Sequence, residues 1–119
     1  MLRALRGATT VDEDTAEQVK ERVTALLNEL FDRNNISRDQ LVSILFTVTD
    51  DLHCGFPATA ARTIGLGDVP MLCARELDIV GSMPRCIRVM VHLDTFKGRD
   101  ELRHVYLEGA SNLRDDLPG

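Results

Sequence analysis

The stretch Val69–Val91 reads Val-Pro-Met-Leu-Cys-Ala-Arg-Glu-Leu-Asp-Ile-Val-Gly-Ser-Met-Pro-Arg-Cys-Ile-Arg-Val-Met-Val. It contains two apolar runs typical of strands, separated by a charged loop with a glycine and a proline. In the second run, an alternation of period two places Arg88 on the face opposite Ile87 and Val89. Because an arginine in an apolar strand is costly unless an anion meets it, Arg88 predicts a binding site for negative charge.

The composition is that of one soluble globular domain. The chain has 119 residues, of which 44% are hydrophobic and 28% are charged. No apolar run is long enough to span a bilayer, and residues 1–7 contain no apolar signal region. We therefore expect a single cytoplasmic domain over residues 1–119, with residues 112–119 as a polar, mobile tail.

Charge and cysteine content exclude several classes of protein. A net charge of −5 disfavours nucleic acid as a partner. The three cysteines, Cys54, Cys73 and Cys86, have no Cys-x-x-Cys spacing, which argues against a disulfide framework and a metal site. Twelve of the 14 basic residues are arginines, which fits either genomic base composition or bidentate recognition of carboxylates.

The remaining segments predict an α+β fold, a mixed β-sheet with helices on one face. In order, we expect a strand over 2–11, a helix that opens at 12–14 and ends at 34–35, a short turn over 37–40 and a strand over 41–49. A short helix then begins at Pro57 and ends just before Gly65. The two strands of the opening stretch follow, and then extended chain from Val105. Gly7, inside the first strand, indicates a bulge or a close backbone approach.

Two helices can cover one face of such a sheet but not both. The second faces of the strands carry Leu45, Cys86 and Met90, and are too apolar to be freely solvated. We therefore expect another subunit to cover them.

Several side chains could form a site for a small di-anion. Arg6 and Arg88 lie on predicted strands, Glu76 lies in the loop between strands, and Tyr106 is the single tyrosine of the chain. Such a set suits the stabilisation of developing charge better than proton transfer. His53 beside Cys54 is an alternative nucleophile pair, but it lacks a third, orienting group.

Five blocks of sequence resemble the monofunctional AroH-class chorismate mutases, in order and with matching spacing. They are Arg-Gly-Ala-Thr-Thr-Val (6–11), Asp-Leu-His-Cys-Gly-Phe-Pro-Ala (51–58), Val-Pro-Met-Leu-Cys-Ala-Arg-Glu-Leu-Asp (69–78), Cys-Ile-Arg-Val-Met (86–90) and Arg-His-Val-Tyr-Leu (103–107). The resemblance implies a homotrimer with a pseudo-α/β-barrel of the Bacillus chorismate mutase type and active sites at subunit interfaces. It implies the pericyclic conversion of chorismate to prephenate in phenylalanine and tyrosine biosynthesis, without cofactor, metal or covalent intermediate.

The same resemblance implies roles for individual residues. Arg88 matches the cation at the ether oxygen, Glu76 the acceptor of the ring hydroxyl, and Arg6 and Tyr106 the residues that hold the side-chain carboxylate. Further substrate contacts are implied for Leu72, Cys73, Ala74 and Arg75, for a wall of Phe56, Ala58 and Arg62 supplied across the interface, and for Leu113 in the tail.

Two other functions would use the same arginines. One is a trimeric sensor that binds a small carboxylate without turning it over. The other is the deamination of imines by a small trimeric enzyme with a carboxylate-binding arginine. Turnover of chorismate distinguishes both from a mutase.

Overall fold

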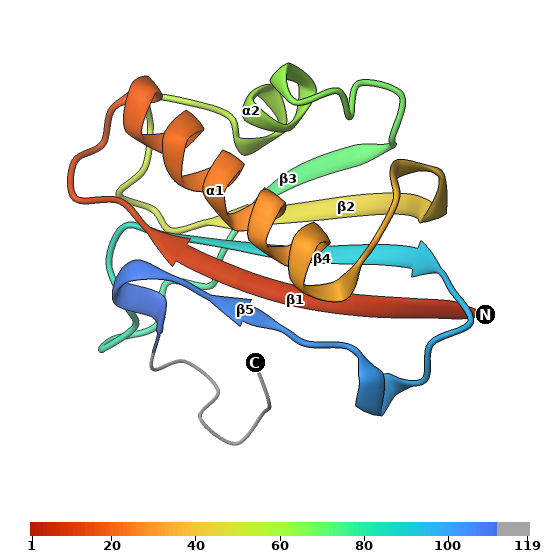
Figure 1. The fold of residues 1–119 in the computed structure, drawn as a ribbon. Helices are drawn as coiled ribbons and strands as arrows, with labels where there is room; N and C mark the ends of the chain where they lie inside the picture. Colours follow the sequence, from red (N-terminus) through yellow and green to blue (C-terminus); the bar gives the residue numbers. More distant parts are fainter. Residues whose placement is uncertain (112–119) are drawn as a thin grey trace.

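A five-stranded mixed sheet forms the centre of the molecule in the computed structural model, which describes residues 1–111 (Figure 1). The strand order is β3-β2-β4-β1-β5, with parallel pairing of β2 with β3 and of β1 with β5, and antiparallel pairing of β4 with β1 and β2. The strands are β1 (Leu2–Thr10), β2 (Leu41–Val48), β3 (Met71–Arg75), β4 (Cys86–Asp94) and β5 (Val105–Tyr106). The predicted α+β class with a mixed sheet is confirmed.

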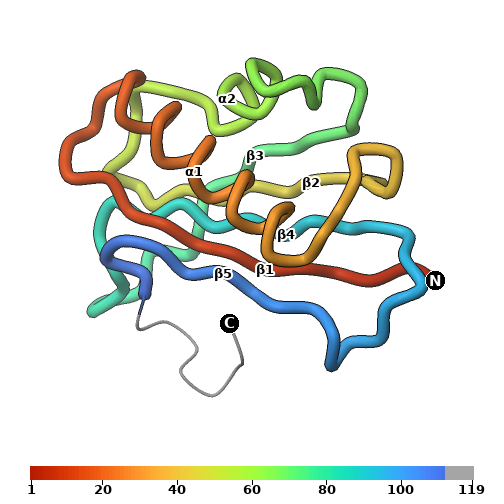
Figure 2. Tube along the Cα trace, in the orientation of Figure 1, coloured from red at the N-terminus to blue at the C-terminus, as the bar shows by residue number. Residues whose placement is uncertain are grey.

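Both helices lie on the same side of the sheet (Figures 1 and 2). They are α1 (Ala16–Asn34) and α2 (Pro57–Thr63), and short 3-10 turns occur at Arg38–Gln40, Arg99–Glu101 and Glu108–Ala110. The apolar stripe of α1 packs against the odd-numbered residues of β1 and β4, and the core includes the fully buried Leu5, Leu26 and Val91. Within residues 1–111, the opposite face of the sheet, here called the open face, carries no α-helix; the 3-10 turn at Glu108–Ala110 packs Ala110 against Ala8 and Cys86 at one end of it.

The start of α1 differs from the prediction. The helix begins at Ala16 and is capped by Thr15, whose Oγ1 accepts a hydrogen bond from the amide of Gln18 at 3.2 Å. Asp14 does not cap the helix: its carboxylate accepts hydrogen bonds from the amides of His53 and Cys54. These bonds lower the pKa of Asp14, with the His53 amide as the largest cause. A tertiary contact between two loops therefore outcompetes the local helix cap.

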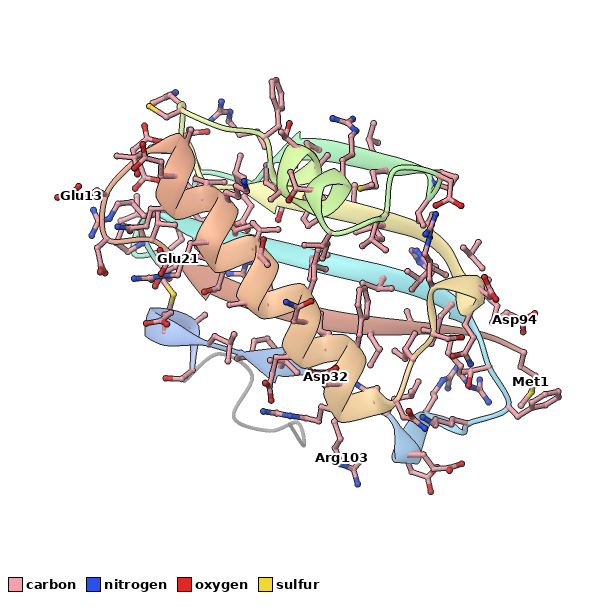
Figure 3. All side chains as sticks on the ribbon, turned by 45° about the horizontal axis from the view of Figure 1, so that its top comes forward. Met1, Glu13, Glu21, Asp32, Asp94 and Arg103 are labelled. Atoms are coloured by element: carbon pink, nitrogen blue, oxygen red, sulfur yellow. The ribbon has the colours of Figure 1, made fainter. Side chains whose placement is uncertain are left out.

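The rest of α1 follows the sequence pattern. Charged side chains such as Glu21 lie on the solvated side of the helix (Figure 3). Asn35, with φ of 51°, ends the helix in the left-handed conformation. The buried Asn34 donates to the Arg103 carbonyl and accepts from the Arg103 amide, so it ties the end of α1 to the chain that leads into β5.

Two details of the strands concern the site. Gly7 faces α1, and a Cβ atom there would lie 3.0 Å from the carbonyl oxygen of Val105 and 3.1 Å from a methyl carbon of Leu26. The predicted close approach is therefore confirmed. Strict alternation along β2 would place Val42 on the buried face with Ile44 and Phe46. Val42 is instead 45% exposed, because the pairing of β2 with β4 shifts between Leu41 and Ser43.

No helix within residues 1–111 combines the length and apolarity needed to cross a membrane.

Candidate functional site

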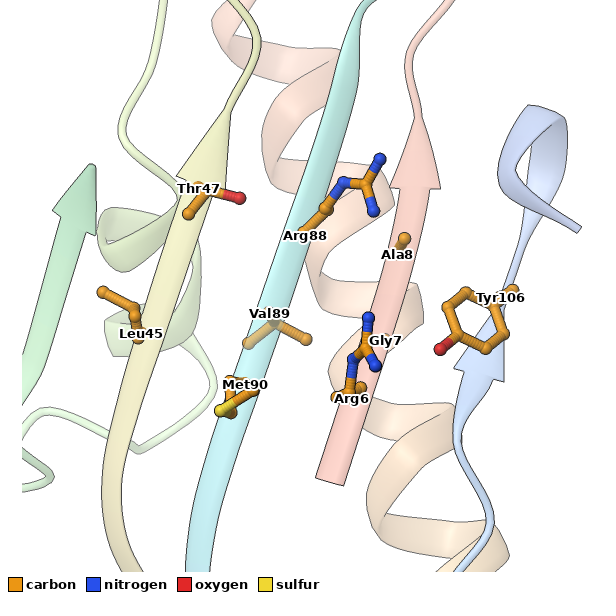
Figure 4. Close-up of a pocket in the computed structure, with 9 residues that line it drawn as sticks. All are labelled: Arg6, Gly7, Ala8, Leu45, Thr47, Arg88, Val89, Met90 and Tyr106. Carbon is orange, nitrogen blue, oxygen red and sulfur yellow. The ribbon is translucent and has the colours of Figure 1, made fainter. Parts of the chain in front are cut away.

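A cavity of about 180 Å³ lies on the open face of the sheet (Figure 4). Strand alternation places its side chains, because Ala8 pairs with Arg88, Arg6 with Met90, and Thr47 with Arg88 in the two antiparallel ladders. The cavity is lined by Arg6, Gly7, Ala8, Leu45, Thr47, Arg88, Val89, Met90 and Tyr106. The structure therefore brings together Arg6, Arg88 and Tyr106, although more than 80 positions separate Arg6 from Arg88 in the sequence.

Glu76 returns over this face directly after β3. Its amide donates to the carbonyl of Val48 at 2.9 Å, which extends the β2–β3 pairing by one residue. Its Oε1 then forms an ion pair with Arg88 Nε at 3.0 Å and accepts a hydrogen bond from Thr47 Oγ1 at 2.8 Å. The side chain of Glu76 is 12% exposed and that of Arg88 is 37% exposed, so the pair is partly shielded from water. Glu76 thus belongs to the same site as Arg6, Arg88 and Tyr106.

The phenol of Tyr106 has no hydrogen-bond partner. Its oxygen is buried and makes no hydrogen bond within residues 1–111, and in Figure 4 it points toward Arg6. A buried hydroxyl without a partner costs about 1–3 kcal/mol. Because the hydroxyl lies on the side of Arg6, in a cavity that Arg88 also lines, a bound anion would satisfy it.

The backbone on this side is held by a histidine. The amide of Arg6 donates to Nδ1 of His104 at 3.0 Å, just before β5 pairs with β1. This hydrogen bond extends the contact between β1 and β5 beyond their two residue pairs and fixes Tyr106 relative to Arg6.

Two of the cysteines, Cys54 and Cys86, have raised pKa values. Burial raises the pKa of Cys86 to about 11, with the Glu76 carboxylate adding to the effect. Desolvation and the Asp14 carboxylate raise the pKa of Cys54, so this thiol stays protonated near neutral pH. Because nucleophilic attack requires a thiolate, the His53–Cys54 alternative finds no support in the structure.

Other predicted site residues lie elsewhere in the chain. Cys73 pairs with Phe46 in the β2–β3 ladder and therefore faces the helices. It lines a second cavity of about 410 Å³ together with Phe56, Ala74 and Arg75. A single chain does not bring this second group into the cavity of Arg6 and Arg88.

Three further predicted site residues differ in how far they are exposed to solvent. Leu72 is 66% exposed, Arg62 is exposed on α2, and the side chain of Ala58 is buried in the core. Leu113 and the predicted mobile tail lie outside the described residues.

Thr47 is the site residue that the sequence did not indicate. Its only signal was its position on the same strand face as Leu45, and Glu76 lies 29 residues further along the chain.

Among residues 1–111, no group of three His, Cys, Asp or Glu side chains is placed to hold a metal ion.

Comparisons with known proteins agree over nearly the full chain. The family model described as chorismate mutase type I matches residues 2–117. The chorismate mutase AroH of Thermus thermophilus is 48% identical over 98% of this chain and 97% of its own length. The chorismate mutase AroH of Bacillus subtilis (strain 168) is 42% identical over 98% of this chain and 93% of its own.

A solved structure supports the fold independently. The structure of a chorismate mutase from Clostridium thermocellum superposes with a TM-score of 0.89 and 44% sequence identity, covering 91% of this chain and 96% of the other.

Proposed function

The chain belongs to the type I, AroH-class chorismate mutases, isomerases that convert chorismate to prephenate, and from this premise we propose a mechanism and an assembly for it. We propose that it acts by electrostatic stabilisation and substrate preorganisation at sites shared between subunits, in phenylalanine and tyrosine biosynthesis. The observation that carries the proposal is the cavity lined by Arg6, Arg88 and Tyr106, in which the Tyr106 hydroxyl is unsatisfied and Arg88 is paired with Glu76.

Arg88 is the proposed catalytic cation. Chorismate rearranges when its side chain folds over the ring, and negative charge grows on the ether oxygen as the carbon–oxygen bond breaks. A fixed cation at that oxygen stabilises the transition state more than the ground state. Arg88 suits this role because a paired strand carries it and Glu76 binds its Nε. The outer amino groups of the guanidinium lie on the side of β1, the strand that carries Arg6 (Figure 4).

Arg6 and Tyr106 are the proposed binding residues for the side-chain carboxylate. They lie on neighbouring strands at the edge of the cavity, and an arginine with a phenol matches the donors that a carboxylate accepts. A bound carboxylate would also satisfy the Tyr106 hydroxyl. Arg6 would thereby fix the enolpyruvyl side chain over the ring, in the geometry that rearrangement requires.

Glu76 is the proposed acceptor for the ring hydroxyl. Its carboxylate lies on the opposite side of Arg88 from Arg6, so hydroxyl and carboxylate contacts would orient the substrate from two ends. Glu76 would also balance positive character on the ring in the transition state.

The second group of residues supports a homotrimer with interfacial sites. Phe56 is 71% exposed beside a cavity that also contains Cys73 and Arg75, and this cavity faces away from Arg88 in the same chain. A wall from a neighbouring subunit would supply these contacts, together with the exposed Leu72, the backbone of Ala58 and Ala74, and Arg62. The same neighbour would cover the open face, where Leu45 and Met90 are only partly buried.

We further propose that the chain forms one domain over residues 1–119, acts in the cytoplasm and requires no metal or cofactor. Leu113 is the proposed contribution of the tail to the site.

The direct test is to mix the purified protein with chorismate and follow the loss of its ultraviolet absorbance. We expect loss far above the uncatalysed rate, with prephenate as the product. Binding of chorismate without turnover would contradict the proposal and favour a sensor, and turnover of imino acids instead would favour a deaminase.

A further inference from the structure

The carboxylate of Glu76 is held at one of its two oxygens only. Oε1 forms an ion pair with Arg88 Nε at 3.0 Å and accepts a hydrogen bond from Thr47 Oγ1 at 2.8 Å. Within residues 1–111, no hydrogen bond reaches Oε2. The protein therefore saturates one oxygen and leaves the other for a ligand.

The sheet itself sets the position of Thr47. Thr47 stands opposite Arg88 in the β2–β4 ladder and opposite Ala74 in the β2–β3 ladder. Strands flank it on both sides, so its hydroxyl has little freedom to move. Glu76, by contrast, follows the last residue of β3 and belongs to a loop.

A glutamate needs such a second contact to present a single oxygen. Its terminal torsion is broad and roughly two-fold, so one bond to Arg88 would leave the plane of the carboxylate free to turn. A second donor from another strand to the same oxygen fixes both the plane and the choice of oxygen. A charge-assisted hydrogen bond of this kind is also stronger than one between neutral groups.

We infer that Thr47 is a positioning residue for the mutase reaction: by holding Oε1 of Glu76, it directs Oε2 to the ring hydroxyl of chorismate. This inference rests on the proposed function, in which Glu76 accepts that hydroxyl. Thr47 acts through Glu76 and need not touch the substrate.

The test compares Thr47→Val with Thr47→Ser. Valine keeps the shape and the strand preference of threonine but removes the hydroxyl, and we expect kcat/KM for chorismate to fall roughly 10- to 100-fold. Serine restores the donor and should return kcat/KM to within about threefold of the wild-type value, by the same hydrogen bond.

Two further measurements separate positioning from a structural effect. With a chorismate analogue that lacks the ring hydroxyl, Thr47→Val should change kcat/KM by less than about threefold, because the contact it supports is absent. In a Glu76→Ala background the same substitution should also have little effect. Ser43→Ala is the matched control, because Ser43 lies on the same strand face but bonds to His92. Circular dichroism and thermal unfolding show whether each variant is folded.

The outcomes distinguish a failure of the positioning role of Thr47 from a failure of the proposed function. If the wild-type protein turns chorismate over but Thr47→Val does so at an unchanged rate, Thr47 has no positioning role. Equal losses with chorismate and with the analogue would also overturn the inference, since they would show a general disturbance of the site. A wild-type protein without mutase activity would instead contradict the proposed function.

Discussion

Arg88 contacts a carboxylate of its own chain and also faces the cavity proposed for the substrate. Its Nε is bound to Glu76, so an ion pair within the protein could by itself explain why an arginine lies in this strand. A substitution that removes the whole side chain would affect the ion pair and the proposed catalytic charge together. The contribution of the charge can be separated from that of shape and of the Nε–H group by a neutral isostere.

Replacement of Arg88 by citrulline, its neutral isostere, makes this separation. Citrulline retains the Nε–H donor to Glu76 but carries no charge. If the charge acts on the ether oxygen, both citrulline and Arg88→Ala should lower kcat by a factor of roughly 1,000 or more, since even one lost oxyanion-type donor costs about 100- to 1,000-fold. Single-turnover kinetics with chorismate measure the effect. A citrulline enzyme that kept most of its activity would show that shape and hydrogen bonding suffice.

Residues of the site differed in how far the sequence could predict them. Arg88 was visible because a charge interrupts an apolar alternation, which is a local signal. The roles of Arg6, Glu76 and Tyr106 came from the family resemblance. Thr47 gave no signal, because its partner Glu76 reaches it only through the parallel pairing of β2 with β3, and periodicity does not reveal which strands are neighbours.

At the scale of elements, periodicity predicted the strands and helices well. The bounds of β1 and β2 differ from the expected ranges by one residue at their ends. The predictions from periodicity and capping were wrong where a contact distant in sequence competes with a local preference. Asp14 binds the loop at His53 in place of capping α1, and the irregular pairing near Val42 turns that side chain outward.

The short β5 strand depends on Gly7. Within residues 1–111, only Gly7 and Ala8 pair with β5, and a methyl group at position 7 would meet the Val105 carbonyl at 3.0 Å. We expect Gly7→Ala to lower the free energy of unfolding by about 1–3 kcal/mol, as overpacking in a core does. It should also weaken chorismate binding, because β5 carries Tyr106. Urea denaturation and KM measure the two effects.

Gly67→Ala is the matched control for this prediction. An added Cβ at Gly67 meets no atom within 4 Å, so we expect a change in stability within about 0.5 kcal/mol, as for other surface substitutions. Equal stabilities of the two alanine variants would show that the close approach at Gly7 is not needed.

At the scale of the whole molecule, the proposed function makes two separate cavities of the chain the two halves of a shared site. One half is the open-face cavity with Arg6 and Arg88, and the other is the cavity beside Phe56 and Cys73. The sequence predicted the need for a second subunit from the uncovered apolar face, but a sequence gives no relative placement of copies. The separation of the two halves in one chain is the structural support for a shared site.

Mixed trimers test this central claim most directly. One variant, Arg88→Ala, loses the first half, and another, with Phe56→Ala and Arg62→Ala, loses exposed residues of the second half. Each should have little activity alone. Co-expressed with different tags and purified as mixed oligomers, they should regain activity, because about a quarter of randomly formed interfaces would combine two intact halves. Initial rates of chorismate loss measure the gain. Activity no higher than the average of the two parent variants would show that each site lies within one chain and would contradict the account.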